Sequence, residues 1–129
     1  MSSKTYILEG AEQPSSQIGL TIETLADIIL SRTSKGEESY TYRLLNGNED
    51  EILKKIIEEA GETALAAKDD DVDHLRYEAA DVVFHLLVLL KKYGISLDEF
   101  AAELNQRMTD EERPDGAIRL HDQYVNRGK

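Results

Sequence analysis

Two pairs of acidic residues stand at a spacing that could hold a metal ion. Glu59 and Glu62 are three residues apart, and so are Glu78 and Asp81. Residues three apart on a helix lie on the same side, one turn apart, so each pair can aim at one point. Two neighbouring antiparallel helices that each carried such a pair would form a cage of carboxylates. Because hard oxygen ligands favour Mg²⁺ or Mn²⁺ over zinc or copper, the spacing predicts a site for one of these two cations.

The second pair lies in a segment that is apolar on most of its sides. At about 100° per residue, Glu78, Asp81 and His85 fall in one strip between two apolar sides of the helix predicted over 72–92. A helix that is apolar nearly all round is buried in its assembly, and burial of two carboxylates without compensation is strongly unfavourable. A metal ion or another cationic group is the natural compensation. His85 taken alone is better explained as a core histidine whose hydrogen bonds are made within the protein.

The first pair has a simpler alternative explanation. Lys54 and Lys55 precede Glu58 and Glu59 by four residues, so salt bridges along a solvated helix face would account for these side chains. The occurrence of acidic pairs on both segments favours a site. Gly61 lies in the same segment, and a glycine in a helix interior costs about 1 kcal/mol relative to alanine. We interpret it as the mark of a close helix crossing, with contact to a ligand phosphate as the alternative.

The elements that must position these residues are predicted to be helices. Apolar residues recur at three- and four-residue spacing, and no segment between the two prolines alternates in the manner of a strand. Asn48 with Glu51, and Ser96 with Glu99, are predicted capping boxes, and Asp69–Asp71 is a predicted turn. The predicted helices cover about 20–33, 49–67, 72–92 and 97–108. The fold class is therefore all-α, an antiparallel arrangement similar to a four-helix bundle.

Length and composition limit the class of protein further. The 129 residues suit one domain at 20–110, preceded by a segment of uncertain order at 1–19 and followed by a polar tail at 111–129. A net charge of −11 excludes nucleic-acid binding through bulk positive charge, and the absence of cysteine excludes disulfides and thiol catalysis. The N-terminus lacks the apolar core of a signal peptide, and the longest apolar stretch is too short to span a bilayer. We expect a cytoplasmic protein with no nucleic-acid or membrane partner.

The motifs resemble those of a known superfamily. Glu-Glu-x-x-Glu at 58–62, followed on the next predicted helix by Glu-x-x-Asp at 78–81, is similar to the signature of the all-α NTP pyrophosphohydrolase (MazG-like) superfamily. With Ser-Tyr-Thr at 39–41 and Phe-His at 84–85, the chain resembles one branch of it, the phosphoribosyl-ATP pyrophosphohydrolase family of histidine biosynthesis. The resemblance covers about residues 20–108.

The resemblance implies a reaction and assigns roles to particular residues. The implied reaction is Mg²⁺-dependent hydrolysis of phosphoribosyl-ATP to phosphoribosyl-AMP and pyrophosphate, with Mn²⁺ as a substitute cation. Glu58 is implied as an auxiliary ligand or as the base that orients the attacking water, and Lys55 as a catalytic contact to phosphate. The implied metal ligands are Glu59, Glu62, Glu78 and Asp81, and the implied substrate-binding residues are Arg32, Ser39, Tyr40, Arg43, Lys54, His85 and Arg107. For Arg43 and Arg107 the alternative is a scattered surface cation without a role in binding.

The resemblance also implies that the protein is a homodimer whose active sites draw on both chains. The two apolar sides of the segment 72–92 independently suggest an interface, since large exposed apolar patches mark sites of association. The fold would then be completed by dimerisation, and the other partner would be a small nucleotide.

Two other functions stay open from the sequence. A house-cleaning pyrophosphohydrolase acting on other nucleotides would use the same carboxylate cage, although the segment 39–41 favours the histidine branch. A non-catalytic helical dimerisation module with a vestigial acidic patch is the second alternative. We interpret 39–43 as a substrate loop; the alternative is that Tyr40 packs over the end of the bundle and Ser39 starts a short helical turn.

Overall fold

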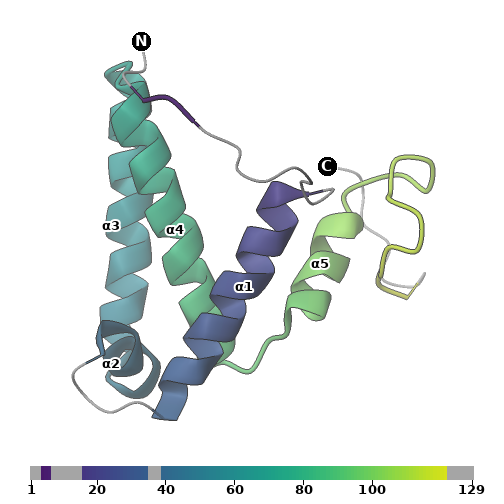
Figure 1. The fold of residues 1–129 in the computed structure, drawn as a ribbon, viewed down its shortest axis with the longest axis horizontal. Helices are drawn as coiled ribbons and strands as arrows, with labels where there is room; N and C mark the ends of the chain where they lie inside the picture. Colours follow the sequence, from purple (N-terminus) through teal and green to yellow (C-terminus); the bar gives the residue numbers. More distant parts are fainter. Residues whose placement is uncertain (1–3, 7–15, 35–38, 122–129) are drawn as a thin grey trace. The chain divides into compact units, whose positions relative to one another are not determined.

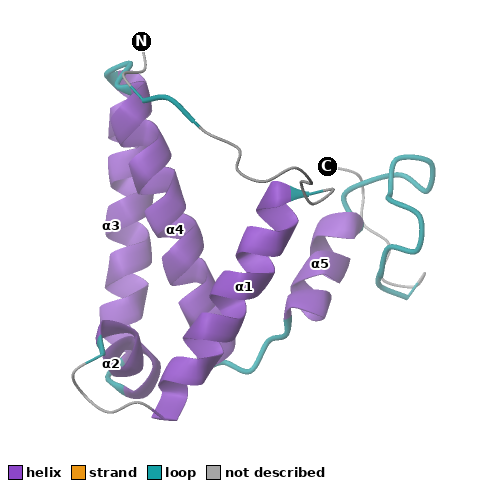
Figure 2. Ribbon diagram, in the orientation of Figure 1, coloured by secondary structure: helices purple, strands orange, loops and turns teal. Residues whose placement is uncertain are grey.

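The protein is helical, and no strand occurs within the residues that the structure describes, which are 4–6, 16–34 and 39–121 (Figures 1 and 2). In this computed structural model the chain divides into two units, Met1–Tyr93 and Gly94–Lys129. The elements in chain order are α1 (Gln17–Ser31), the 3-10 helix η1 (Arg32–Ser34), α2 (Tyr40–Asn46), α3 (Glu49–Lys68), α4 (Val72–Lys92) and α5 (Leu97–Asn105). The predicted all-α class is confirmed. Within the described ranges, no helix combines the length and apolarity needed to cross a membrane.

The helices α3 and α4 form an antiparallel hairpin in the first unit, and Figure 1 shows them side by side. The turn between them contains Asp70 at φ 57°, a left-handed conformation that aspartate tolerates better than most non-glycine residues. Asp71 caps α4, because its Oδ1 accepts a hydrogen bond from the backbone N–H of His74 at 3.1 Å. Since the turn is centred on Asp70, positions 59 and 81 are equally far from it along the two helices. The hairpin therefore brings the two predicted acidic pairs to the same level.

The core of the first unit lies where α1 and α2 pack against α4. Each of the four α-helices of this unit contributes one fully buried large side chain to the core. These side chains are Ile29, Leu44, Ile52 and Val88. Complete burial of a side chain of this size contributes about 1.5–3 kcal/mol, and here it fixes the end of the hairpin that carries the start of α3.

The predicted helix boundaries are close to the observed ones. The predicted helix 72–92 coincides with α4, and Gly94 follows it at φ 71°, the left-handed conformation that terminates helices. The capping box of Ser96 and Glu99 is confirmed. Asn48 caps α3 as expected. Its side chain accepts a hydrogen bond from the N–H of Asp50 at 2.8 Å, in place of the predicted capping box with Glu51.

The interpretation of 39–43 as a loop needs correction, because this segment forms the start of α2, and the alternative in which Ser39 starts a short helical turn is confirmed. Ser39 is the N-cap, and its Oγ accepts a hydrogen bond from the N–H of Tyr42 at 3.2 Å. Thr41, Leu44 and Leu45 are buried. A helix of this length is too short to show a full apolar stripe and is stable only through such tertiary packing.

The close helix crossing expected at Gly61 is also wrong. A Cβ atom added to this residue would meet nothing within 4 Å, and the position is exposed on α3. The described part of the chain gives no packing reason for a glycine there.

The second unit contains α5 and the turns that follow it. Ala102 is its buried apolar residue on α5. The Arg113 guanidinium donates to the carbonyls of Asn105 and Met108 at 3.2 and 2.7 Å. A turn is present at Pro114, with Gly116 at φ 76° and a hydrogen bond from the Ala117 N–H to the Pro114 carbonyl at 3.1 Å.

Lys92, at the end of α4, forms hydrogen bonds with the C-terminal end of α2. Its ammonium group donates to the carbonyls of Leu44, Leu45 and Gly47 at 3.2, 2.8 and 3.1 Å. The last carbonyls of a helix have no partners within the helix itself, and a cation also interacts favourably with the negative end of the helix dipole. One side chain therefore holds α2 against the hairpin.

We predict that Lys92→Met lowers the free energy of unfolding by about 1–2 kcal/mol, because hydrogen bonds to a charged group are lost and several carbonyls lose their partner. Urea denaturation followed by circular dichroism measures the change. Lys91→Met is the matched control, since Lys91 makes none of these three hydrogen bonds, and it should unfold close to the wild-type midpoint. Equal midpoints for the two variants would contradict the role given to Lys92.

Candidate active site

Three of the predicted metal ligands come together between α3 and α4. Carboxylate oxygens of Glu59, Glu78 and Asp81 lie within 4.8 Å of one another. Glu59 and Glu78 are buried, with exposed fractions of 7% and 4%, and Asp81 is half-buried. The hairpin register therefore produces the cage that the spacing predicts.

The fourth predicted ligand, Glu62, lies in a second group that shares one residue with the first. Side-chain ligand atoms of Glu62, His74 and Glu78 are again within 4.8 Å of one another. Glu62 and His74 are exposed, whereas Glu78 is buried. Glu78 thus belongs to both groups and is the residue around which the four carboxylates gather.

The electrostatics of these groups show how crowded the carboxylates are. Close approach of the Glu59 carboxyl, followed by burial and by the approach of the Glu62 carboxyl, raises the pKa of Glu78 to about 7, and the hydrogen bond with His74 works in the opposite direction. Burial, followed by the charge of Glu59, raises the pKa of Asp81. The Oε1 atom of Glu78 is buried and has no hydrogen-bond partner in the structure. Crowded oxygen ligands with an unpaired buried oxygen fit a hard divalent cation such as Mg²⁺ or Mn²⁺.

Two hydrogen bonds connect the Tyr40 side chain of α2, through His85, to the backbone carbonyl of Asp81 on α4. The Nδ1 atom of His85 is 2.9 Å from the carbonyl oxygen of Asp81. Because a carbonyl can only accept, Nδ1 carries the proton, and in the neutral ring Nε2 is then an acceptor. The hydroxyl of Tyr40 lies 2.9 Å from Nε2 and therefore donates to it. Both ring nitrogens of His85 are engaged within the protein, which agrees with the alternative that describes it as a core histidine.

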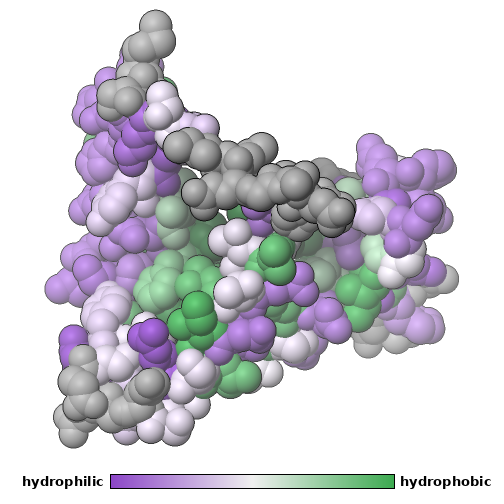
Figure 3. Space-filling model, in the orientation of Figure 1, coloured by the Kyte–Doolittle hydropathy of each residue, from purple (hydrophilic) through white to green (hydrophobic). Residues whose placement is uncertain are grey.

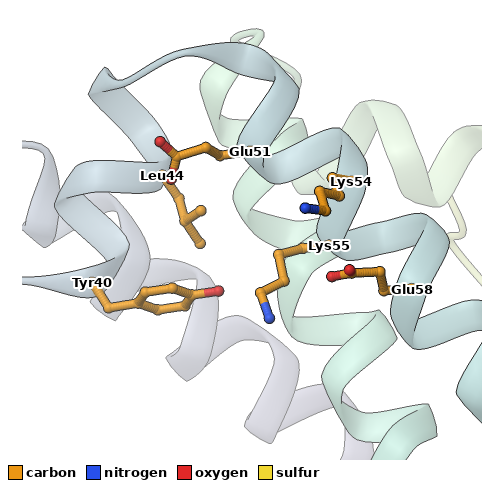
Figure 4. Close-up of a pocket in the computed structure, with 6 residues that line it drawn as sticks. All are labelled: Tyr40, Leu44, Glu51, Lys54, Lys55 and Glu58. Atoms are coloured by element: carbon orange, nitrogen blue, oxygen red, sulfur yellow. The ribbon is translucent and has the colours of Figure 1, made fainter.

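A cavity of about 260 Å³ lies next to the Tyr40 side chain (Figure 4). In Figure 4 the Tyr40 hydroxyl and the Lys55 ammonium group point toward each other. The Lys55 Nζ atom is also 3.9 Å from Glu59 Oε1, one helical turn along α3. Burial raises the pKa of the Tyr40 hydroxyl, and the charge of Lys55 opposes this. The cavity is lined by Tyr40, Leu44, Glu51, Lys54, Lys55 and Glu58, so four of the predicted site residues share it.

The remaining predicted substrate residues have other local roles. Ser39 is the cap of α2, and Arg32 lies in η1. The guanidinium carbon of Arg43 lies 5.9 Å from the centre of the Tyr40 ring, and Arg43 lines a second hollow of about 350 Å³ next to Glu51. Arg107 belongs to the second unit, where its guanidinium donates to the carbonyl of Glu103 at 2.5 Å.

Two residues at the site were missed by the sequence reasoning, namely His74 and Glu51. A usable signal existed for both. His74 precedes Glu78 by four residues, and Glu51 precedes Lys55 by four, so each lies one turn from a predicted site residue on the same helix face. The resemblance to known motifs pointed to neither.

The fold and the site define an all-α protein with an acidic cage that could hold a metal ion, beside a cavity lined by lysines. Residues 22–108 match the family model for phosphoribosyl-ATP pyrophosphohydrolase. The chain therefore belongs to the phosphoribosyl-ATP pyrophosphohydrolase family, and the predicted family is confirmed. With it, the predicted class of enzyme, a hydrolase acting on a phosphoanhydride, is confirmed as well.

Individual relatives agree with this family. A phosphoribosyl-ATP pyrophosphatase of Neisseria gonorrhoeae is 45% identical over 80 residues, which are 62% of this chain and 75% of that protein. Phosphoribosyl-ATP pyrophosphatase 1 of Rhodopseudomonas palustris is 47% identical over 88 residues, covering 67% of this chain and 82% of the relative. The phosphoribosyl-ATP pyrophosphatase of Pyrobaculum calidifontis is 42% identical over 88 residues, covering 67% of this chain and 94% of that protein.

We predict that Asp81→Asn stabilises the metal-free protein and removes its response to metal. Two like charges about 4 Å apart repel by about 1 kcal/mol even in water, so the variant should melt about 4 °C higher than the wild type in EDTA. Mg²⁺ should raise the melting temperature of the wild type, because a ligand bound by the native state alone stabilises that state, and should leave the variant unchanged. Circular dichroism melts in EDTA and in Mg²⁺ measure both effects.

Asp50→Asn is the matched control for this experiment. Asp50 is exposed in the first turn of α3, about 13 Å along the helix from Glu59 at 1.5 Å per residue. This variant should melt no higher than the wild type in EDTA and should still be stabilised by Mg²⁺. Superimposable wild-type melts in EDTA and Mg²⁺ would contradict a metal-binding cage.

Proposed function

We propose that the protein hydrolyses the α–β phosphoanhydride of phosphoribosyl-ATP in a reaction that depends on Mg²⁺, with Mn²⁺ as a substitute. Water adds to the α-phosphorus, the bond to the bridging oxygen breaks, and phosphoribosyl-AMP and pyrophosphate are released. The observation that carries the proposal is the contact between Lys55 and Glu59, because it joins the lysine-lined cavity to the carboxylate cage. Family membership supports the choice of substrate.

The residues of the cage supply ligands for the cation. Glu59, Glu78 and Asp81 form one group, and Glu62 approaches the same Glu78 carboxyl from α3. When bound there, a divalent cation neutralises phosphate oxygens and lowers the pKa of a coordinated water molecule. Phosphoryl transfer needs positioning and charge neutralisation more than covalent help from the protein, and this site offers both.

The residues of the cavity act on the substrate. Lys54 and Lys55 offset the charge of the polyphosphate, and the hydroxyl of Tyr40, held by His85, contacts it through its free lone pairs. Glu58 lines the same cavity and orients the attacking water or serves as an auxiliary ligand. A protein with a net charge of −11 can bind a polyanion in this way because the cations are supplied locally.

We also propose that the protein is a homodimer whose active sites draw on both chains. Large apolar residues of the hairpin are exposed, among them Ile57, Leu65 and Tyr77 at 73%, 64% and 60%. On the face shown in Figure 3, hydrophobic residues gather over α1 and α4. Monomeric proteins seldom leave apolar surface of this extent in contact with water. A cytoplasmic location stays a prediction from the sequence.

The carboxylates are tested by Glu59→Gln and Asp81→Asn. An amide keeps the shape of the side chain but removes the charge that holds the cation, so each variant should lose at least about a thousandfold in kcat, equivalent to about 4 kcal/mol. Pyrophosphate release from phosphoribosyl-ATP, with and without Mg²⁺, measures the loss, and far-UV circular dichroism should show an unchanged helical fold. Asp50→Asn serves as the control and should retain wild-type turnover. A wild-type rate in either cage variant would refute the assignment.

The choice between phosphoribosyl-ATP and other nucleotides is tested at Arg43. If its guanidinium contacts the phosphoribosyl group bidentately, Arg43→Ala should weaken kcat/KM for phosphoribosyl-ATP by about 1–3 kcal/mol. Hydrolysis of canonical deoxynucleoside triphosphates should change less, because the cage is untouched. Arg43→Lys keeps the charge without the bidentate geometry and should fall in between.

Ser39→Ala separates this effect from loss of structure. It removes the N-cap of α2, which costs about 1 kcal/mol of stability, so its losses should be similar for all nucleotides. Equal losses for all nucleotides in Arg43→Ala would favour the house-cleaning alternative. An absence of Mg²⁺-dependent turnover on every substrate would favour the non-catalytic module.

A further inference from the structure

His74 is linked to the carboxylate cage although it belongs to no part of the acidic motif. Its Nε2 atom lies 2.8 Å from Oε2 of Glu78, one turn further along α4. The two partners differ greatly in exposure, because 49% of the His74 side chain is accessible and only 5% of the Glu78 side chain. A solvent-facing imidazole thus makes a hydrogen bond to a buried carboxyl group.

The two oxygens of Glu78 have different surroundings. Oε2 is in contact with His74, whereas Oε1 is buried and lacks a hydrogen-bond partner. The same carboxyl group lies within reach of Glu59 and Asp81. We propose that His74 is a positioning residue, which holds Oε2 and thereby orients Oε1 toward the cation; this inference rests on the metal site of the proposed function.

The direction of this hydrogen bond follows from the chemistry of the bound state. A carboxylate that ligates a cation is ionised and can only accept, so the proton in the contact comes from Nε2–H of His74. Hydrogen-bonded partners of metal ligands fix the orientation of the ligand, and their loss usually weakens metal binding by about 10–100-fold.

The backbone of His74 is itself held in place. Its N–H donates to Oδ1 of Asp71, the N-cap of α4, at 3.1 Å. The imidazole therefore starts from a capped first helical turn, and the four-residue spacing to Glu78 places both side chains on one face of the helix. Each of the two buried cage residues is paired in this manner, because Lys55 stands one turn before Glu59 in the same relation on α3.

Two other roles for His74 make different predictions. As an ordinary ion pair on a helix surface it would affect stability slightly and metal binding not at all. As a direct ligand, in a group with Glu62 and Glu78, it would place an imidazole nitrogen on the metal. Mn²⁺ distinguishes these roles because it is paramagnetic and reports on nitrogen atoms bound to it.

The experiment compares the wild-type protein with His74→Ala, His74→Gln and Arg76→Ala in titrations with Mn²⁺ alone. Free Mn²⁺ is followed by electron paramagnetic resonance. We expect His74→Ala to bind Mn²⁺ about tenfold more weakly, at the low end of the usual range because the imidazole is half-exposed. His74→Gln should recover most of the affinity, since its amide N–H can reach the same oxygen. Arg76→Ala removes a positive charge two residues away, whose guanidinium pairs with Asp73, and should bind Mn²⁺ like the wild type.

Each of the other outcomes overturns a defined part of the inference. Unchanged affinity in His74→Ala, or an equal loss in Arg76→Ala, would reduce His74 to a surface charge. A strong nitrogen hyperfine coupling to Mn²⁺ in the wild-type pulsed spectrum, absent from His74→Gln, would make it a ligand instead of a positioning residue. A wild-type protein that binds no Mn²⁺ would refute the metal site itself, and with it the proposed function, whereas the first two results leave that site intact.

Discussion

The main constraint on the structure is the close approach of several carboxylates between the two packed helices α3 and α4. Glu59 and Glu78 are buried, Asp81 is half-buried, and their oxygens approach one another within 4.8 Å. Mutual repulsion and loss of hydration both oppose this arrangement. The apolar core and the antiparallel hairpin have to hold it in place against that repulsion, so the site is preorganised by the rest of the first unit. The same crowding is the basis for proposing a small, doubly charged cation as the occupant, because oxygen ligands favour such ions.

Two side chains next to the cage, Lys55 and His74, satisfy its carboxylates incompletely. Lys55 pairs with Glu59 at 3.9 Å and His74 with Glu78 at 2.8 Å. Both come from the preceding turn of the same helix, so neither depends on how α3 and α4 pack. One oxygen of Glu78 is still without a partner. The protein thus keeps its ligands ordered while leaving an acceptor for the proposed cation, an arrangement in which some stability is given up for function.

The cage could be predicted from sequence because it follows from helix geometry. The cage depends on local properties of the sequence. These are the spacing of three residues, the acidic turn and the equal distance of the two acidic pairs from Asp70, and together they place the carboxylates once α3 and α4 form. The helix α2 could not be predicted in the same way. It has seven residues, its stability comes from burial of Leu44 and Leu45, and its C-terminal carbonyls are satisfied by Lys92, which is far away in the sequence. Whether another helix crosses at Gly61 could not be predicted either, because a crossing depends on a neighbouring helix that local spacing does not specify.

The attachment of α2 has a mechanical consequence for the cavity. Its first residue, Tyr40, is joined to His85 on α4, and its last turn is joined to Lys92 on the same helix. The helix α2 is about 10 Å long at 1.5 Å per residue. Because both of its ends are hydrogen-bonded to α4, neither end is free to move away from that helix. We therefore expect the cavity wall formed by Tyr40 and Leu44 to keep its place when a ligand enters. If the proposed substrate binds there, we expect adjustment to its shape to come from the long side chains of Lys54 and Lys55, which also line the cavity and change rotamer at a lower free-energy cost than a helix can tilt.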